Sequence, residues 1–422
     1  MNIKTKLFID RFFGQILCFI LAPAVYCAGK ILRIDHSIND KNVKTIAAAK
    51  YFGMGSITHC IPTLKALKNK YPAAKLTFIT RINNKELIPL IPYIDEALYI
   101  DDSDFAKLFI SSFKILFALW RKRTDLFFDF EVFSSYGTMM SVFSLARNRF
   151  GFFWARSTGF KTFLYTHLMY FNFDVPLRMS YMQLSYLAKT DIAASVALEP
   201  FNLDETVYSS AKEKISEAFR TDAKLLCINV NASDFSYTRR WSLKNFADAA
   251  VHFAKKDYNI LLLGSPGEKE YINGIYGFIP DDKKITGRIY NAAGYFSIKE
   301  VLAVLRLCDA FLTNDSGLMN LGYAQGTKTV SLYGASKPQF VHINNGINTA
   351  IYKKVYCSPC LHIFDTPPCR NLSVCINNIT TGEVIGAVEN ILKINGKASF
   401  GTSDIIAGEN NGYVMGTLVR RS

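Results

Sequence analysis

Glycines and polar side chains cluster where the first apolar run of the chain ends. Gly53, Gly55, Ser56 and His59 lie within seven residues, at the start of a stretch with helical periodicity. A glycine turn of this kind presents backbone N–H groups at the carboxyl edge of a parallel sheet, where they bind phosphate or another anion. The turn has neither the Gly-Lys-Ser/Thr of a Walker loop nor the third glycine of a dinucleotide-binding loop. It therefore predicts an anion site without specifying the ligand.

A second polar turn follows the apolar run that ends at Thr313. Asp315 and Ser316 are residue types that cap a helix, and Gly317 lets a ligand approach the free N–H groups of the first helical turn. Asn320 comes one turn later. This arrangement predicts a diphosphate site, although an ordinary N-cap turn has the same pattern.

A third turn, 264–268, follows another apolar run. Gly264 and Gly267 suit a tight strand-to-helix turn, and Glu268 is an acid of the kind that holds ribose hydroxyls. Each turn alone is ordinary. Because two of them fall in one half of the chain, they favour a nucleotide site there.

These turns need a scaffold that brings strand ends together, and the hydrophobic pattern predicts one. Short apolar runs alternate with helix-length amphipathic runs, which is typical of parallel sheets with helical crossovers. We therefore predict an α/β fold with two Rossmann-like domains. The expected strands are 43–49, 76–80, 97–100, 126–130, 225–230, 260–263, 310–313 and 329–333.

A polar stretch interrupts the alternation and divides the chain. We predict an N-terminal helical region at 1–40, a Rossmann-like domain at 41–195, a linker at 196–222, a second Rossmann-like domain at 223–395 and a flexible tail at 396–422.

The composition indicates a folded protein with an anionic partner. Half of the 422 residues are hydrophobic, and 49 Lys and Arg against 35 Asp and Glu give a net charge of +14. Phosphate, nucleic acid and an acidic membrane surface all fit this charge. No nucleic-acid recognition module is apparent, so nucleic acid is disfavoured. The segment 105–173, rich in aromatic and basic residues, is interpreted as a core with solvated basic turns or as a face that meets an anionic lipid.

The first 40 residues hold an apolar run that predicts contact with a membrane. Residues 12–29 carry no charge, and these 18 positions are the lower limit for a spanning helix. We expect Pro23 to break the run. Polar residues recur at helical spacing before it and basic residues flank it, so we favour an amphipathic helix at 1–40 that lies in the membrane interface. A spanning segment, a signal peptide and a core helix are the alternatives.

The cysteines divide into two groups. Five of the nine lie singly in apolar runs, which suits a reducing cytoplasm. The other four are Cys357, Cys360, Cys369 and Cys375. Their spacing matches a structural zinc site only in part; a disulfide and reduced packing thiols are the alternatives, and reduced thiols fit best.

Four segments, taken together in their order and spacing, carry a resemblance to a known family. They are the Gly53–Ser56 turn with the Pro62-Thr-Leu-Lys-Ala-Leu and Tyr71-Pro-Ala-Ala stretches after it, Arg239-Arg240-Trp241, the 264–268 turn, and Thr313-Asn-Asp-Ser-Gly317. From about residue 43 to 388 the chain resembles glycosyltransferase family 9, whose best-known members are the lipopolysaccharide heptosyltransferases.

The resemblance implies a GT-B fold. In that fold two Rossmann-like domains face a cleft, with the acceptor on the N-terminal domain and the nucleotide sugar on the C-terminal one. It implies neither a catalytic metal nor a cofactor. It also implies that the last helix, 381–394, crosses back to the N-terminal domain.

The resemblance further assigns a donor site. Ser316, Gly317 and Asn320 would face the donor diphosphate. Arg239 or Arg240 would neutralise the leaving nucleotide. The expected donor-binding residues are Gly53, Gly55, Arg239, Arg240, Ser265, Gly267, Glu268, Asp315, Ser316, Gly317 and Asn320.

Two positions depart from the family pattern. Many family members have an aspartate as general base where this chain has Ser56, and serine cannot accept the acceptor proton unaided. We therefore expect His59, one helical turn later, to be the base, with Asp129 and Glu131 as the next candidates. The second departure is Asn320 in place of a histidine; asparagine still donates a hydrogen bond but carries no charge.

The sequence therefore predicts an inverting, metal-independent glycosyltransferase. It would move a sugar, with heptose as the first guess, from a nucleotide-diphosphate sugar to a lipid-linked oligosaccharide in surface-glycan synthesis. The expected location is peripheral, on the cytoplasmic face of the inner membrane. Because Ser56 replaces the usual base, the alternative is a catalytically impaired sugar-nucleotide-binding or assembly protein at the membrane.

Overall fold

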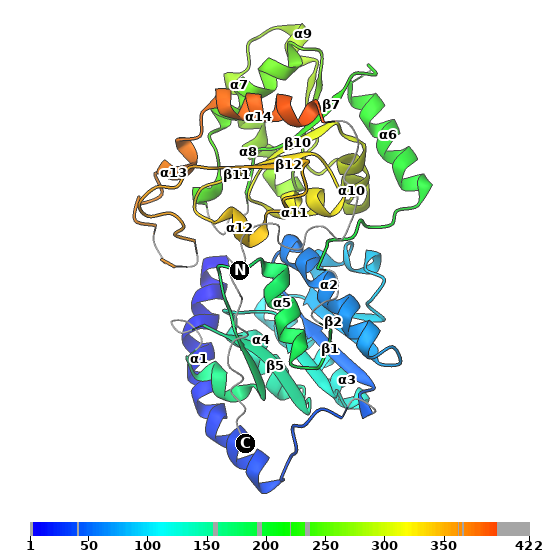
Figure 1. Cartoon of the computed structure of the whole chain (residues 1–422), viewed down its shortest axis with the longest axis vertical. Coiled ribbons are helices and arrows are strands. Elements are labelled where there is room, and N and C mark those ends of the chain that lie inside the picture. Colours follow the sequence, from blue (N-terminus) through cyan, green and yellow to red (C-terminus); the bar gives the residue numbers. More distant parts are fainter. Residues whose placement is uncertain are drawn as a thin grey trace. The chain divides into compact units, whose positions relative to one another are not determined.

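Two compact units make up the structure, which is a computed structural model (Figure 1). It describes residues 3–39, 42–154, 159–191, 196–219, 221–232, 237–361, 363–364 and 367–394. The chain passes from the first unit to the second between Val196 and Ala197. Each unit is built on its own six-stranded sheet, and every strand pairing in both sheets is parallel.

The sheet of the first unit has the strand order β3-β2-β1-β4-β5-β6. Its central strand β1 places Ala47 beside Thr77 of β2 and Phe127 of β4. Helices cover both faces of this sheet, so its central strands are buried on both sides, as their apolar sequences predict. The strands are β1 (Thr45–Ala49), β2 (Lys75–Arg81), β3 (Glu96–Ile100), β4 (Leu126–Asp129), β5 (Asn148–Phe153) and β6 (His167–Tyr170).

The second sheet repeats this order as β9-β8-β7-β10-β11-β12. The predicted α/β fold with two Rossmann-like sheets is therefore confirmed, and each predicted strand overlaps an observed one. The strands are β7 (Leu225–Asn229), β8 (Asn259–Leu262), β9 (Ile289–Asn291), β10 (Ala310–Asn314), β11 (Thr329–Tyr333) and β12 (Asn348–Tyr352).

Four strands, β5, β6, β9 and β12, were not predicted. β6, β9 and β12 are edge strands, where burial is partial. β5 is largely buried, but it begins with the polar residues Asn148 and Arg149 and therefore lacks the continuous apolar run that predicts a strand. Short outer strands bury fewer side chains and so leave a weaker hydrophobic pattern.

The helices of the first unit fall on two faces of its sheet. α2 (Met54–Lys70) packs against α5 (Leu177–Tyr186), whereas α3 (Phe105–Lys122) packs against α4 (Ser135–Phe143). Right-handed crossovers place α2, which connects β1 to β2, on one face. They place α3 and α4, which lead toward β4 and β5, on the other. α4 also contacts the N-terminal helix α1 (Ile3–Ile31).

α1 is one continuous helix of 29 residues that runs through Pro23. The predicted break at Pro23 is therefore wrong, because the outer apolar surface and the packed inner side continue past the proline. Asp10 joins α1 to α4: its carboxylate accepts hydrogen bonds from the backbone N–H groups of Ser135 at 3.0 Å and Tyr136 at 2.6 Å. Gly14 contacts Ser135 so closely that a Cβ there would lie 2.4 Å from the Ser135 Cβ.

The outer side of α1 is apolar and exposed. Within the described residues, one helical segment is long and apolar enough to cross a membrane, Phe8–Ile31, with a mean hydropathy of 1.8 and 11% of its most apolar window buried. The helix contacts α4 and the 3₁₀ turn Gly159–Leu164 along its inner side. Whether α1 lies in a membrane interface stays a prediction.

The second unit includes the helix α6 (Glu205–Phe219), which occupies much of the predicted linker. It packs on α10 (Ile298–Leu307), where Ser210 and Lys214 hold Glu300 at 2.7 and 2.8 Å. The remaining helices are α7 (Leu243–Ala254), α8 (Lys269–Asn273), α9 (Lys283–Thr286), α11 (Gly317–Ala324), α12 (Pro338–Val341), α13 (Val374–Asn377) and α14 (Thr381–Leu392). The predicted tail at 396–422 lies outside the described residues.

The last helix α14 packs on its own unit. Its buried side chains Val384, Val388 and Ile391 join the core formed by β7, β8, β10, β11 and α7. The sequence predicted that this helix crosses back to the N-terminal domain, but its buried side chains pack in the second unit. They are the apolar stripe of the helix, and the sheet of the second unit covers them.

Asp10 is expected to hold α1 on the first unit. Asp10→Ala leaves two N-terminal N–H groups of α4 without their carboxylate partner, so we expect a loss of about 1–2 kcal/mol in unfolding free energy and faster amide exchange at Ser135 and Tyr136. Hydrogen–deuterium exchange with urea unfolding tests this. Asp104→Ala, which removes the N-cap of α3, is the control. Unchanged exchange at Ser135 and Tyr136 in Asp10→Ala would show that the cap does not hold α1.

Candidate functional site

Each sheet has one point where its strand order reverses, and polar residues gather at both points. In the first unit this point lies between β1 and β4, and in the second between β7 and β10. The crossovers leave in opposite directions there, so the carboxyl ends of the two strands are not covered by a connecting segment. Ligands of doubly wound folds bind at such switch points.

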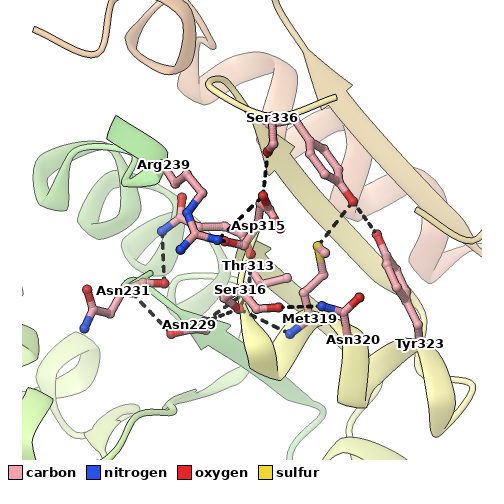
Figure 2. Close-up of polar contacts among 12 residues, drawn as sticks. Asn229, Asn231, Arg239, Thr313, Asp315, Ser316, Met319, Asn320, Tyr323 and Ser336 are labelled. Carbon is pink, nitrogen blue, oxygen red and sulfur yellow. Dashed lines mark hydrogen bonds and ion pairs between the residues drawn. The ribbon is translucent and has the colours of Figure 1, made fainter. Parts of the chain in front are cut away.

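In the second unit, the hydroxyl of Ser316 is the centre of the switch point (Figure 2). Ser316 is the N-cap of α11, and its Oγ accepts a hydrogen bond from the backbone N–H of Met319 at 3.2 Å. From β7, the side-chain amide of Asn229 donates to the same Oγ at 2.9 Å, and Thr313 Oγ1 lies 3.2 Å away. Asn320, one turn into α11, donates to the carbonyl oxygen of Ser316 at 3.0 Å. The first turn of α11 is thereby held in a fixed position.

Arg239 brings a positive charge to this helix N-terminus. Its Nη1 donates to the backbone carbonyl of Asp315 at 3.1 Å and lies 3.7 Å from the Asp315 carboxylate. Ser336, which follows β11, donates to that carboxylate at 2.5 Å. Asp315 therefore orients Arg239 and is not the helix cap. The positive end of the α11 dipole and the guanidinium together favour a bound anion.

Arg240 points elsewhere. Its guanidinium donates to the carbonyl of Ala232 at 2.9 Å and lies over the rings of Tyr237 and Tyr271, at 4.3 and 4.8 Å from their centroids. Of the two arginines that the sequence offered for the leaving group, Arg239 is the one beside Ser316.

The third turn predicted from the sequence also reaches this region. Ser265 and Glu268 form a capping box, with the Ser265 backbone N–H donating to the carboxylate at 2.6 Å. The other carboxylate oxygen of Glu268 accepts from the side chain of Asn231, just beyond β7. No described atom lies within 4 Å of a Cβ built on Gly267, so the backbone is open there.

Four polar residues of the site escaped the sequence analysis: Asn229, Asn231, Asn314 and Ser336. The side chain of Asn314 accepts from the Trp241 backbone N–H at 3.0 Å and donates to the carbonyl of Val230 at 3.0 Å, so it ties the end of β7 to Trp241, two residues after Arg239. Asn229 and Asn314 are the last residues of buried strands. A polar residue at the carboxyl end of an apolar strand was the signal that could have found them.

In the first unit, the glycine turn precedes α2. Gly53 is the N-cap residue, with φ 83°, a conformation that favours glycine, and no side chain of the described residues caps it. Gly55 is buried and Ser56 is half-buried. The side chain of His59 is completely buried among the residues of α2 that face the core.

Glu131 occupies the switch point of the first unit. One of its carboxylate oxygens accepts from the backbone N–H groups of Tyr51 at 2.8 Å and Phe52 at 3.0 Å, and the other lies 2.7 Å from Lys50 Nζ. The loop after β1 therefore wraps around a carboxylate of the same unit. The Glu131 side chain keeps 9% of its surface exposed.

Asp129 lies behind Glu131 at the end of β4 and is completely buried. Burial raises the pKa of its carboxyl to about 7, against the opposing hydrogen bond from the Tyr165 hydroxyl at 2.6 Å. The backbone N–H of Glu131 donates to the other Asp129 oxygen at 3.0 Å. Gly137 makes room for this carboxyl, because a Cβ there would lie 2.7 Å from its oxygen.

The four clustered cysteines were a candidate zinc or disulfide site. All of the chain's cysteines are free thiols in the structure. Among the described residues, which include Cys357, Cys360, Cys369 and Cys375, no group of three or more His, Cys, Asp or Glu is arranged to hold a metal ion. Burial raises the pKa of the Cys360 thiol to about 11, so this thiol is protonated at neutral pH. The choice of reduced thiols over zinc or a disulfide stays a prediction.

Comparison with known proteins identifies the family. The model of glycosyltransferase family 9 (heptosyltransferase) matches residues 136–369. Lipooligosaccharide heptosyltransferase 2 of Campylobacter jejuni is 30% identical over 176 residues, which is 41% of this chain and 53% of that protein. The chain thus spans about half the length of the curated relative it matches.

Two solved structures have the same fold. A family 9 glycosyltransferase from Veillonella parvula has a TM-score of 0.66 at 21% identity, covering 85% of this chain and 99% of its own. The ADP-heptose lipopolysaccharide heptosyltransferase II of Escherichia coli has a TM-score of 0.64 at 19% identity, covering 83% and 98%.

The raised pKa of Asp129 predicts a pH-dependent stability. The folded carboxyl binds its proton more tightly than the unfolded one, so between about pH 4 and 7 the unfolding free energy falls as pH rises. The expected slope from this one group is about 1.4 kcal/mol per pH unit. Asp129→Asn is expected to remove that slope.

Urea unfolding of both proteins at several pH values measures it. Asp125→Asn is the control, because it also removes one carboxylate from the same unit. The Asp125 carboxylate accepts hydrogen bonds from the backbone N–H groups of Lys44 and Thr45. Equal pH slopes in the wild type and Asp129→Asn would contradict the assignment.

Proposed function

The chain belongs to glycosyltransferase family 9, and we propose that it transfers a sugar, first of all a heptose, from a nucleotide-diphosphate donor to a lipid-linked oligosaccharide. The observation that carries this proposal is the switch point of the second unit, where the N-terminus of α11 and Arg239 converge. The proposal includes inversion at the anomeric carbon, because one displacement by an acceptor hydroxyl inverts that carbon.

The donor diphosphate is proposed to bind at Ser316 and Gly317. The departing nucleoside diphosphate gains negative charge in the transition state, so fixed positive groups at its oxygens accelerate the reaction. Arg239 and the N–H groups of α11 are such groups. Arg239 is held by its hydrogen bond to the Asp315 carbonyl, and the start of α11 is held by the bonds of the Ser316 hydroxyl to Asn229 and Thr313. ADP-heptose is the first donor candidate, from the name of the Escherichia coli relative.

Glu268 is proposed to lie near the nucleoside. Its hydrogen bonds to Ser265 and Asn231 fix the carboxylate at the carboxyl end of β8, beside the open backbone of Gly267. A ribose hydroxyl is the expected partner, since a carboxylate accepts two such bonds.

The acceptor hydroxyl must lose a proton, and Glu131 is the base that we now propose. His59 is completely buried on α2, and Asp129 is completely buried behind Glu131. Ser56 is half-buried but is no base unaided. Glu131 keeps an exposed fraction at the carboxyl edge of the sheet, and one of its carboxylate oxygens lies 2.7 Å from Lys50 Nζ.

A specific observation keeps the second candidate function open. The first turn of α2 has Ser56 where the family commonly has an aspartate as general base, and Glu131 is already bonded to the loop that precedes this helix. A protein that binds a sugar nucleotide but turns it over poorly has the same donor site. Binding without turnover would distinguish it.

The proposed location is the cytoplasmic face of the inner membrane, where the enzyme is peripheral. The net charge of +14 suits an anionic leaflet, and the exposed apolar side of α1 suits its interface.

Donor binding is expected to stabilise the protein. A nucleotide at 100 times its dissociation constant adds about 2.7 kcal/mol to the unfolding free energy, which a thermal midpoint detects. We expect ADP and ADP-heptose to raise the midpoint more than UDP, GDP or CDP. Arg239→Gln is expected to weaken binding about 10- to 100-fold, because a charge-assisted hydrogen bond is lost.

Arg288→Gln is the matched control for that variant, since Arg288 pairs with Asp257 on the surface of the same unit. Equal affinities of Arg239→Gln and Arg288→Gln would remove Arg239 from the donor site. A midpoint that no nucleotide raises would overturn the proposed function itself.

The base assignment predicts an order of turnover numbers. Glu131→Gln keeps the shape of the side chain but removes its basicity, so kcat should fall about 10²- to 10⁴-fold while donor affinity stays within about threefold. Ser56→Ala should change kcat little. Glu86→Gln, an exposed glutamate of the same unit, is the control.

Transfer of radiolabelled sugar to a lipid-linked acceptor measures these rates. If His59→Ala lowers kcat and Glu131→Gln does not, the earlier expectation for His59 holds and the assignment to Glu131 fails. If the wild type binds donor but transfers nothing to any acceptor tested, the second candidate function is favoured.

A further inference from the structure

We propose that α3 forms, together with α1, a two-helix surface that docks the first unit on an anionic membrane leaflet. The inference deepens the membrane location given above and rests on it. The sequence analysis predicted membrane contact for the N-terminal helix and left the segment 105–173 open between a core with basic turns and a face that meets an anionic lipid. The structure narrows the second possibility to one helix of that segment, α3.

The outer side of α3 is aromatic and exposed. Phe109, Phe113 and Phe117 recur every four residues, with 74%, 54% and 52% of their surfaces accessible. The opposite side of the helix holds Ile115 and Leu119, which are buried in the unit's core. A helix that is apolar on both sides contacts two apolar environments. The core of the unit is one of these environments. Within the described part of the chain, no other apolar environment covers the phenylalanine side of α3.

The charges on α3 specify an anionic environment. From Phe105 to Lys122 the helix contains no acidic residue. Lys114 and Arg121 are exposed beside the phenylalanines, and Arg121 lies over the Phe117 ring at 6.0 Å. Long basic side chains cover apolar surface with their stems while their charges reach lipid headgroups.

Trp120 marks the end of this surface. It is 37% exposed, its ring packs edge-on against Phe113 at 5.9 Å, and its indole N–H donates to the carbonyl of Phe143 at 2.6 Å. Tryptophan is enriched at the boundary between lipid and water, because it is apolar with one polar group. Leu145 follows the end of α4 and is 74% exposed, so it extends the apolar surface past that helix.

α1 and α3 lie on the same face of the sheet, with α4 between them. Tyr136 of α4 contacts both: its backbone N–H donates to Asp10, and its hydroxyl lies 2.6 Å from Ser112 Oγ of α3. Asp10 is the only acid in α1, and its bonds to α4 turn it away from solvent. The exposed side of α1 therefore presents apolar side chains, among them Phe12 and Ile16, without an acidic residue.

A leaflet fits these observations better than a second copy of the chain. Two copies that met through this face would bring Arg11, Lys114 and Arg121 of both copies together with no acid from either helix to balance them. Anionic headgroups supply the opposite charge, and acyl chains cover the phenylalanines.

The test measures binding of the full-length protein to vesicles. Vesicles of phosphatidylcholine alone are compared with vesicles that contain phosphatidylglycerol, and bound protein is separated by flotation. The triple variant Phe109→Ser, Phe113→Ser, Phe117→Ser should bind at least about tenfold more weakly, since affinity follows the buried apolar area. Binding should persist at a lower level through α1.

A matched control variant comes from the second unit. Phe278→Ser, Tyr356→Ser, Leu372→Ser also removes three exposed apolar side chains, which are 49%, 91% and 70% accessible. It should bind vesicles as the wild type does. The double variant Lys114→Gln, Arg121→Gln should have a weaker preference for phosphatidylglycerol and keep the binding to phosphatidylcholine. Far-UV circular dichroism checks that each variant folds.

Fluorescence gives a second readout. Brominated lipids should quench Trp120 in the bound protein, and Trp120→Phe should remove most of the quenching. Trp241 is completely buried in the second unit and should stay unquenched.

The outcomes separate this inference from the function on which it rests. If the α3 triple variant binds vesicles as tightly as the wild type and Trp120 is not quenched, the inference is overturned. Membrane binding is then assigned to α1. Absence of vesicle binding overturns both the inference and the location, while donor binding and sugar transfer, measured with a soluble acceptor, still test the activity. A dimer that the triple variant abolishes in the absence of lipid would show that a second copy covers α3.

Discussion

The structure depends on which groups accept hydrogen bonds from the backbone at the uncovered strand ends of each switch point. Backbone N–H groups there have no partner in the sheet, and burial without a partner costs free energy. The first unit meets this constraint with its own carboxylate, because Glu131 accepts from the N–H groups of Tyr51 and Phe52 and is balanced by Lys50. The second unit meets it with neutral side chains around Ser316 and leaves the N-terminus of α11 beside Arg239.

This difference explains why two units with the same strand order need not bind the same ligand. A carboxylate of the chain already fills the anion position in the first unit, so that position repels a phosphate and favours a neutral hydroxyl group. In the second unit the neutral side chains of Asn229, Thr313 and Ser316 hold the N-terminus of α11 in place without adding negative charge. Asp315 is the exception, but Ser336 and Arg239 both compensate its carboxylate. These side chains are the basis of the proposed division of roles between the acceptor and the sugar donor.

Much of the fold could be predicted from the sequence, and the limits have physical causes. Central strands such as β7 have continuous apolar runs because both faces are buried, whereas β9 has three residues and β12 is only partly buried. The three polar turns were found because glycine and capping residues have local signatures. The bonds from Asn229 to Ser316 and from Asp10 to Tyr136 join residues 87 and 126 positions apart, and no local pattern carries such pairs. For the same reason, the burial of His59 was not predictable from its place one turn after Ser56.

The loop between β4 and α4 links the proposed acceptor site to α1, which is proposed to contact the membrane. It begins with Asp129 and Glu131 and ends at Ser135, where Asp10 of α1 accepts the backbone N–H. Lys161, completely buried with its pKa lowered by burial, donates to the carbonyls of Val132 and Ser134 and so closes the loop from the side. Hydrogen bonds hold both ends of this loop, so they connect α1 to the position of Glu131. The helix that would touch lipid and the carboxylate that would take the acceptor's proton are thus joined through one short loop, which suits an enzyme whose acceptor is itself anchored in lipid.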